Sequence, residues 1–428
     1  MTKILYTFIW IFLFWAVLPL QAAFVGEKPS DYQLKQVVVL SRHNIRAPVS
    51  TNGSVLESVT PHTWFAWTSG PSELSLRGGE LETLMGQYFR KWLVKAGLIV
   101  ENEIPRHGQM RFYANSMQRT IATAQYFSSG MLPVANIKIE HRYRPSRMDP
   151  VFTPQFVFIS EAFKKMALEQ ILKMAGVDEI KNIGENLTDE YKILEKVLDF
   201  RHSQFAKDRQ LVHFPTNDLE IILSAYEEPA MRGSLKVAQQ ASDALILQYY
   251  EVSDGEKASF GHKLQMADWQ TLAQINEAYI DVLVTAPAVA VHVAHPLLKE
   301  LLKEINNKHR KFTFLCGHDS NLASVLAALE VEPYQLPNSI EKKTPVGSKV
   351  VWSKWLGKDG KEYVSLDLVY QSTQQLRNRD MLSLENPPQV FALSLRGLSP
   401  NSDGLYALED MQARFKQAID AFYSLPRN

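Results

Sequence analysis

Two short apolar runs, each followed within three residues by a histidine, constrain the fold of this chain more than any other feature. The run VVVL precedes Arg42 and His43, and the run FTFLC precedes Gly317, His318 and Asp319. Uninterrupted apolar runs of this length are typical of strands buried on both faces, as in a parallel sheet covered by helices. We therefore predict an α/β fold in which both histidines lie just past the carboxyl ends of strands.

Helical patterns alternate with these strands. After the strand-like segment RFYA, Ser116 is a possible helix cap, and a helix from Met117 would carry Arg119 in its first turn. Another helix is expected from about Leu322. The remaining expected elements are a helix in GGELETLMGQYFRKWLVKAG that stops at Gly97, two strands in KVVWSKWL and EYVSLDLVYQS, and a closing helix in LEDMQARFKQAIDAFY.

The middle of the chain has a different pattern. Its apolar spacing is mostly helical, as in DEYKILEKVLDF and WQTLAQINEAYIDVL, which indicates a mainly α-helical insertion. A chain of 428 residues also exceeds the usual size of one domain. We predict residues 1–23 as a signal peptide, 24–150 and 289–428 as the two parts of an α/β domain, and 151–288 as the helical insertion.

The N-terminus predicts export. Lys3 precedes an apolar run from Ile4 to Leu20, and the small residues Ala22 and Ala23 follow it, as in a secretory signal peptide. A retained membrane anchor is the alternative, because the run approaches the ~20 residues that span a bilayer. We expect no stable membrane association after the signal is removed, and a periplasmic or secreted location in a bacterium.

The charge balance narrows the partner class. Basic and acidic residues are equal at 46 each, so the formal charge is zero. This balance argues against a nucleic-acid or polybasic membrane surface, and it favours a small-molecule partner.

Three predicted strand ends would bring their polar side chains together. In an open parallel sheet the crevice outside the carboxyl ends of the strands is the usual ligand site. Arginine forks bind phosphate oxygens in pairs, so the set suits a phosphate dianion. The plainer alternative is that each cluster is a solvated strand end or a capped turn. The residues concerned are Arg42, His43, Arg46, Arg119, His318 and Asp319.

No metal or cofactor is expected. His292 and His295 are three residues apart but lack an acidic helper, so core or surface histidines are the better interpretation. Cys316 is the single cysteine, which rules out an intramolecular disulfide, and its apolar surroundings favour a buried structural thiol.

The motifs around these residues resemble those of a known family. RHNIRAP at 42–48 resembles the R-H-G-x-R-x-P signature of the histidine acid phosphatases, and GHDSN at 317–321 resembles their His-Asp motif. NSMQRT at 115–120 looks like the segment that supplies a further phosphate-binding arginine. The resemblance covers essentially the whole chain after residue 23. It implies a phosphoglycerate-mutase-like, mainly parallel sheet flanked by helices, with a mostly α-helical inserted domain that roofs the pocket and sets specificity.

The resemblance also implies residue roles. His43 would be the nucleophile that forms a phosphohistidine, and Asp319 would be the general acid. Arg42, Arg46, Arg119 and His318 would bind the phosphate. RHG at 106–108 mimics the signature letters, but it lacks a preceding strand and the second arginine, so we do not expect it to be catalytic.

Asn44 stands where the signature has glycine, and this departure, with NGSVLE at 52–57, is closer to the bacterial glucose-1-phosphatases than to the phytases. The expected reaction is hydrolysis of glucose 1-phosphate to glucose and phosphate. Glu228, Asp243 and Gln248 are candidate sugar contacts, although each could equally be part of a solvated face.

Three other functions stay open. The nearest is a phytase or broad-specificity periplasmic acid phosphatase that uses the same residues. A non-catalytic exported sugar-phosphate binding protein would keep the arginines, but it has no need of a nucleophile beside an acid. A mutase-like phosphotransferase would fit a cytosolic role better than an exported one.

Overall fold

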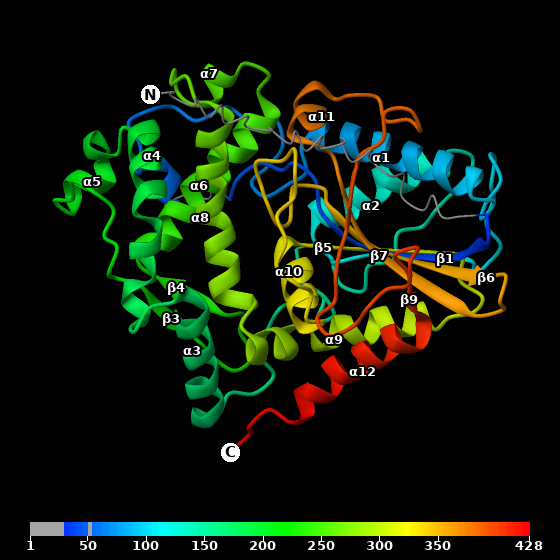
Figure 1. The fold of residues 1–428 in the computed structure, drawn as a ribbon. Helices are drawn as coiled ribbons and strands as arrows, with labels where there is room; N and C mark the ends of the chain where they lie inside the picture. Colours follow the sequence, from blue (N-terminus) through cyan, green and yellow to red (C-terminus); the bar gives the residue numbers. More distant parts are fainter. Residues whose placement is uncertain (1–29, 50–53, 145) are drawn as a thin grey trace, which may run out of the picture.

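A computed structural model describes residues 30–49, 54–144 and 146–428, so the predicted signal peptide lies outside the described residues. Figure 1 shows a central sheet with helices on both faces and a mainly helical part at one side of it. The α/β class predicted from the sequence is confirmed.

The main sheet is mixed rather than mainly parallel. Within the described residues it has seven strands in the order β2-β5-β1-β6-β7-β8, with β9 pairing with β7. Among these described strands, only the pairs β1–β5 and β2–β5 are parallel. The expectation of a mainly parallel sheet was wrong because β6 returns directly as β7, and a tight turn can join only antiparallel neighbours. The strands are β1 (Tyr32–Arg42), β2 (Met110–Ala114), β5 (Phe312–Gly317), β6 (Lys349–Gly357), β7 (Glu362–Tyr370), β8 (Gln389–Ala392) and β9 (Tyr406–Ala407).

Both faces of the central strands are buried, as their apolar runs predict. Along β1, Val37 and Val39 pack into the core under α1 and α2, whereas Val38 and Leu40 pack on the opposite side against α9, α10 and α12. The alternation follows from the two-residue period of a strand. These helices are α1 (Leu76–Lys95), α2 (Gln118–Met131), α9 (Pro287–Ile305), α10 (Asp319–Ala328) and α12 (Leu408–Tyr423).

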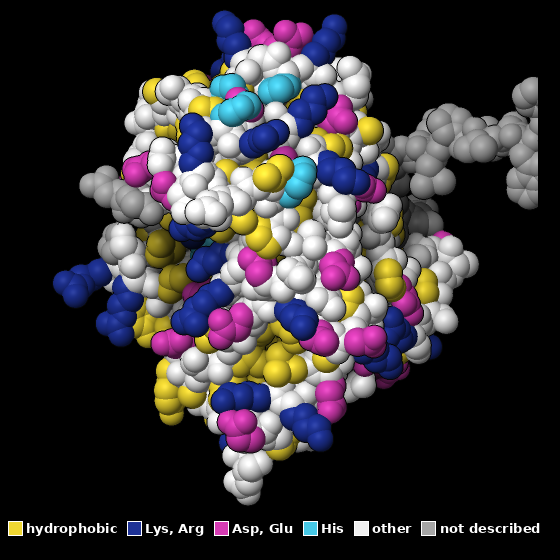
Figure 2. Space-filling model, turned by 90° about the vertical axis from the view of Figure 1, so that its left-hand side faces the viewer, with side chains coloured by type: hydrophobic (Ala, Val, Ile, Leu, Met, Phe, Trp, Pro, Cys, Tyr) yellow, Lys and Arg dark blue, Asp and Glu magenta, His cyan; other side chains and the backbone are white. Residues whose placement is uncertain are grey.

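The helical part has its own large apolar cluster, and Ile45 and Leu81 extend that cluster into the α/β part. A small antiparallel pair, β3 (Glu220–Ile222) with β4 (Ala230–Arg232), interrupts the helices. Figure 2, which faces this side, shows positive and negative side chains interspersed, in keeping with the balanced composition. Its helices are α3 (Glu161–Ala175), η2 (Ile180–Leu187), α4 (Thr188–Leu198), η3 (Phe200–His202), α5 (Gln204–Asp208), α6 (Ser234–Glu251), α7 (Gly255–Ala258) and α8 (Met266–Val284), and two short helices lie elsewhere, η1 (Val55–Glu57) and α11 (Thr373–Asn378).

Several elements lie where the sequence predicts them, but the start of α10 and the cap of α2 differ. The predicted β6, β7 and α12 are present, and Gly97 follows α1 with a left-handed φ of 73°. α10 begins at Asp319 rather than at about Leu322. Ser116 does not cap α2, because Met117 occupies the cap position and the Ser116 hydroxyl instead accepts the N–H of Tyr143.

In the part of the chain that the structure describes, no single helix is long and apolar enough to cross a membrane. α8 and α9 reach the required length and apolarity only as a pair, which is bent by 85°.

Candidate active site

The strand ends that carry the signature residues meet because of sheet register. Arg42 on β1 pairs with Gly317 on β5, and Ala114 on β2 pairs with Cys316. The N–H of His43 donates to the carbonyl of Gly317 at 3.1 Å. The imidazole rings of His43 and His318 therefore lie with centroids 5.4 Å apart.

The His43 ring is fixed in one tautomer. Its Nδ1 lies 2.9 Å from the backbone carbonyl oxygen of Asn44, which can only accept a hydrogen bond. Nδ1 therefore carries the proton, and Nε2 keeps a free lone pair. Burial, followed by the charges of Arg119, His318, Arg46 and Arg42, lowers the pKa of His43 well below its usual value. The imidazole consequently stays neutral and nucleophilic in mildly acidic solution.

Asn115 fixes the tautomer of His318, which is the same as that of His43, with the proton on Nδ1. The Asn115 side-chain oxygen accepts the N–H groups of Ser116 and Asp149, so its amide nitrogen is the donor to Nε2 of His318 at 2.7 Å. The ring proton of His318 must then lie on Nδ1, which is 3.5 Å from Nη2 of Arg119. Burial and the neighbouring arginines lower the pKa of His318, so a neutral ring presents an N–H to this space.

Arg42 is held by a buried carboxylate and a carbonyl. Its Nη1 donates to Oε1 of Glu341 at 2.6 Å and to the carbonyl of Thr344 at 2.5 Å, and its Nη2 lies 3.3 Å from Oδ2 of Asp319. Burial alone would lower the pKa of Arg42, but the charges of Glu341, Asp319 and Asp243 outweigh it and raise the pKa. Arg42 is thus a permanent cation in a fixed orientation.

Arg46 and Arg119 complete the cationic cluster. Nη2 of Arg46 lies 3.0 Å from Oδ2 of Asp243. Arg119 lies in the first turn of α2, where burial and the charge of Arg46 lower its pKa to about 10. The Nε atoms of Arg42 and Arg119 are buried and have no hydrogen-bond partner among the residues that the structure describes. Such unsatisfied donors are what an anionic ligand would bind.

Asp319 stands at the amino end of α10, beside these cations. The N–H of Ser320 donates to its Oδ1 at 2.8 Å, and its side chain is 22 % exposed. Its carboxyl group is therefore open to a ligand, unlike that of Glu341, which is 4 % exposed. The N-cap is His318, whose N–H donates to the side chain of Asn321 at 2.9 Å.

Of the three candidate sugar contacts, Gln248 must be withdrawn. It is buried, its side-chain oxygen accepts the N–H of Phe65, and its amide nitrogen donates to the carbonyl of Ala258. Both polar ends are therefore used within the protein. Asp243 contacts Arg46 within the cluster.

Glu228 lies in the segment between β3 and β4. Although the residue as a whole is exposed, its carboxyl group is largely surrounded by protein, and this burial of the carboxyl group raises its pKa. The positive charge of Arg119 is close enough to oppose the rise in the pKa of this carboxyl group. Tyr279 on α8 is within electrostatic reach of both Glu228 and Asp319. Burial and these two charges raise the pKa of Tyr279 to about 12.

Sequence reasoning missed several supporting residues. Glu341 and Thr344 lie in a segment without regular structure, where no pattern marks them. The side chain of Asn44 donates to Oε1 of Glu82, and this oxygen also accepts Nζ of Lys349 at 3.0 Å in a fully buried ion pair. Asn115 is the first residue of the NSMQRT segment at 115–120, but the sequence assigned it no role; a polar residue at a strand end was the available signal.

The other motifs lie outside this cluster. The RHG segment at 106–108 lies on an exposed turn, and Cys316 is buried with a raised pKa caused chiefly by burial. His292 and His295 pack against Phe422, which confirms them as core residues. Within the described ranges, no three His, Cys, Asp or Glu side chains are grouped so that they could hold a metal ion.

This arrangement places a neutral imidazole lone pair beside three guanidinium groups and an accessible carboxyl group, a combination that suits phosphoryl transfer. The model of the histidine phosphatase superfamily (branch 2) matches residues 33–368, and the chain belongs to this family. It is a phosphatase that acts on phosphate esters.

Curated relatives and solved structures agree with this assignment. The chain is 37 % identical over 398 residues to a glucose-1-phosphatase of Salmonella typhimurium, covering 92 % of this chain and 94 % of that protein. It is 36 % identical over 414 residues to a glucose-1-phosphatase of Providencia rettgeri, covering 95 % and 97 %. The apo structure of the Hafnia alvei phytase matches with a TM-score of 0.84 and 25 % identity, covering 93 % of this chain and 100 % of that one.

Proposed function

We propose that this phosphatase hydrolyses glucose 1-phosphate to glucose and inorganic phosphate through a phosphohistidine on His43. The observation that carries the proposal is the orientation of His43. Its Nδ1–H is bound to the Asn44 carbonyl, so the Nε2 lone pair is available beside the arginine cluster. Two relatives at 36 % and 37 % identity bear the name glucose-1-phosphatase, which supports this substrate.

In the first step, Nε2 of His43 attacks phosphorus and the bond from phosphorus to the ester oxygen breaks. The protonated carboxyl group of Asp319 gives its proton to the departing oxygen, so that the sugar leaves as an alcohol. In the second step, water attacks phosphorus, Asp319 accepts a proton from this water, and the N–P bond breaks. Phosphate is released, and both side chains return to their starting states.

Fixed donors stabilise the charge on the transferred group. Arg42, Arg46 and Arg119 supply cations, and His318 supplies its Nδ1–H, to oxygens that carry the spread charge of the transition state. Because Glu341 and Asp243 already hold two of these guanidiniums, little reorganisation is needed when the ester binds. The mechanism needs no cofactor.

Substrate choice depends on the segment that carries Glu228. A carboxylate near the arginine cluster can accept hydrogen bonds from sugar hydroxyls, and it repels the additional phosphates of phytate. This argument favours a sugar monophosphate. The alternative is a phytase, which is favoured by the fold likeness to the Hafnia alvei enzyme and by a 28 % identity to phytase AppA of Escherichia coli.

A substrate panel tests the choice. Phosphate release from glucose 1-phosphate and from phytate is measured at about pH 4 to 5, where carboxyl groups begin to hold protons, with a metal chelator present. We expect a higher kcat/KM for glucose 1-phosphate than for phytate. Glu228→Gln should reduce the difference between the two values by raising turnover of phytate. Equal kcat/KM for both substrates in the wild type would contradict the proposal and make phytase the better assignment.

We also propose that the protein is exported to the periplasm, on the basis of the apolar run from Ile4 to Leu20. Cell fractionation, with mass spectrometry of the mature N-terminus, tests this. A mature chain that begins shortly after Ala23 is expected, and an intact N-terminus in the membrane fraction would identify a retained anchor.

A further inference from the structure

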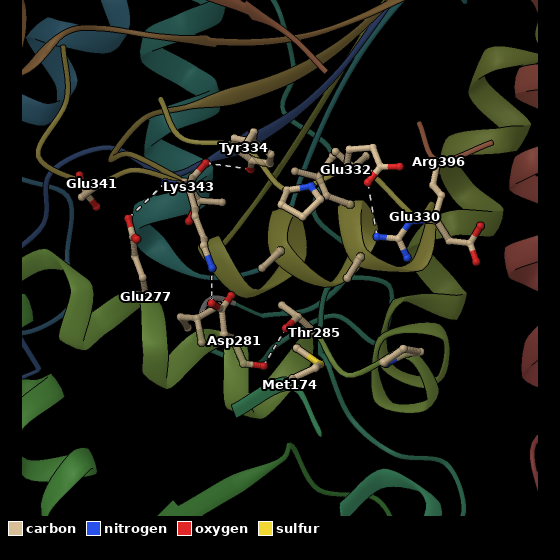
Figure 3. A pocket seen from close by; sticks show the side chains of 18 of the residues that line it. Met174, Glu277, Asp281, Thr285, Glu330, Glu332, Tyr334, Glu341, Lys343 and Arg396 are labelled. Carbon is tan, nitrogen blue, oxygen red and sulfur yellow. Dashed lines mark hydrogen bonds and ion pairs between the residues drawn. The ribbon is translucent and has the colours of Figure 1, made fainter. Parts of the chain in front are cut away.

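A second cavity, of about 460 Å³, lies behind the phosphate site. Figure 3 shows its residues, most of which come from α8, from α10 and from the segments at 330–334 and 341–344. This volume is within the ~300–1,000 Å³ range of small-molecule sites. Its apolar wall includes Ile280, Leu326, Val331 and Pro333.

The charged residues around this cavity are mostly paired. Glu341 binds Arg42, Asp281 binds Lys343, Glu332 binds Arg396, and Glu330 binds Arg414. Each of these carboxylates therefore has a cation as partner within the protein.

Glu277 is the exception. Its Oε1 accepts the backbone N–H groups of Lys342 and Lys343, the latter at 3.1 Å, and no cation within the described residues forms an ion pair with it. Its Oε2 accepts no hydrogen bond from the described residues, and Figure 3 shows the side chain at the same cavity as Asp281 and Lys343. Among the described carboxylates that line the cavity, Glu277 is thus the one without an ion-pair partner, and it lies beside an apolar wall.

We propose that this cavity is a binding site for a small organic cation. An ammonium group would bind Oε2 of Glu277, and the hydrocarbon part of the ligand would cover Ile280, Leu326 and Pro333. A neutral donor could use the oxygen but would leave the carboxylate charge unpaired, so an amine with an apolar body is the better match.

The wall between the two sites is the segment at 341–344. Glu341 and the carbonyl of Thr344 hold Nη1 of Arg42 on one side, and Glu277 holds the intervening N–H groups of Lys342 and Lys343 on the other. Glu341 also accepts the N–H of Val346 and the hydroxyl of Tyr250, which fixes it further. A ligand that changes how Glu277 holds this segment will change phosphate binding at Arg42, and by linkage phosphate will change ligand binding equally.

Proton release gives a readout that non-specific binding would not give. Burial raises the pKa of Glu277 to about 7, with Lys343 opposing it and the charges of Glu341 and Asp281 adding to it; Tyr334 is the further titratable group near Glu277. A bound cation favours the ionised carboxylate. Binding at about pH 7 should therefore release roughly half a proton.

The test is calorimetric titration of the mature enzyme with phenethylamine at about pH 7 in two buffers of different ionisation enthalpy. 2-Phenylethanol is the uncharged control ligand. We expect saturable 1:1 binding of the amine, proton release, and binding of the alcohol that is about tenfold weaker or more. No binding of the amine, or equal affinity for amine and alcohol, would overturn the proposal.

Matched variants locate the site. Glu277→Gln should weaken amine binding about tenfold or more and abolish proton release, because it keeps an acceptor for the two N–H groups but loses the charge. Glu332→Gln makes the same change at a paired carboxylate of the same cavity, and it should leave the affinity within about twofold. Ala327→Phe, which adds a ring at another residue that lines the cavity, should also abolish binding. Equal affinity in Glu277→Gln and wild type would contradict the assignment.

The coupling is measured with inorganic phosphate, without turnover. Saturating phenethylamine should change the phosphate affinity about threefold or more, a coupling of typical size for linked sites, and Glu277→Gln should remove this effect. An unchanged phosphate affinity in the amine-saturated enzyme would refute the coupling. Neither titration depends on which phosphate ester the enzyme hydrolyses.

Discussion

Nδ1 of His43 lies 2.9 Å from the carbonyl oxygen of Asn44, and this contact determines which nitrogen of the nucleophile is free. The backbone carbonyl of Asn44 is thus the acceptor for His43. The side chain of Asn44 donates to Glu82, which forms a buried ion pair with Lys349. The orientation of the nucleophile is consequently connected to α1 and β6 through one asparagine.

Replacing His43 by alanine should reduce kcat by roughly 10⁴-fold or more, because it removes the nitrogen that forms the covalent intermediate. Rapid quenching of wild type with labelled glucose 1-phosphate should trap a phosphoryl group that is stable in alkali and labile in acid, as expected of phosphohistidine. His292→Gln, at a buried histidine outside the site, should retain activity. Activity of His43→Ala within tenfold of wild type would refute the nucleophile assignment.

Replacing Asp319 by asparagine should have an effect that depends on the leaving group. We expect a loss of about 10²–10³-fold on glucose 1-phosphate and a much smaller loss on 4-nitrophenyl phosphate, whose leaving group needs little protonation. Asp243→Asn is the matched control, because Asp243 also contacts a site arginine. It should lower both rates by similar factors. Equal losses on both substrates in Asp319→Asn would argue against a role as general acid.

The buried His292 should contribute to loss of stability in acid. Burial lowers its pKa from 6.5 to about 4. In the unfolded chain His292 takes up a proton below about pH 6.5, whereas in the folded protein it does so only near pH 4. Between these two pH values the proton binds mainly to the unfolded chain, so the folded protein loses stability as the pH falls from about 6.5 to about 4. His292→Gln, which keeps an acceptor for the N–H of Val157, should reduce the pH-dependent loss between about pH 7.5 and 4.5 by about 2 kcal/mol. Urea unfolding at both pH values measures this, and parallel losses in variant and wild type would show that His292 is not responsible.

Lys349→Met should destabilise the protein by about 3–5 kcal/mol near neutral pH, because it leaves the buried Glu82 without its cation. The loss should shrink in acid, where Glu82 can take up a proton. Lys358→Met removes a cation from an exposed pair with Asp31 and should change the urea midpoint little. Similar midpoints for the two variants would indicate that the buried pair contributes no more than an exposed one.

Local sequence patterns predicted the position of the central strands but not the direction in which their neighbours run. The apolar runs of β1 and β5 placed His43 and His318 at strand ends, because a strand buried on both faces needs an uninterrupted apolar sequence. They did not reveal that β6 lies antiparallel beside β1, since strand direction depends on how distant segments are connected. α10 begins about one turn before the expected start at Leu322. His318 is its N-cap residue, and the N–H of His318 donates to the side chain of Asn321.

Side-chain roles outside the signature motifs were less predictable. The amide side chain of Gln248 could hydrogen-bond a sugar, but in the fold its oxygen and its nitrogen both bind backbone groups of the protein itself. Glu341 carries no local signal, yet it holds Arg42. In both cases the partner lies far away in the sequence, where periodicity and motif spacing give no information.

The sequence by itself determined the family, the α/β class and the identity of the charged side chains, because these depend on residue types within short segments. The tertiary structure alone decided the tautomers of His43 and His318, the buried partners of Arg42 and Asn44, and the second cavity around Glu277. Each of these depends on hydrogen bonds or walls shared between segments that are distant along the chain. Such contacts exist only after the sheet register has brought the segments together.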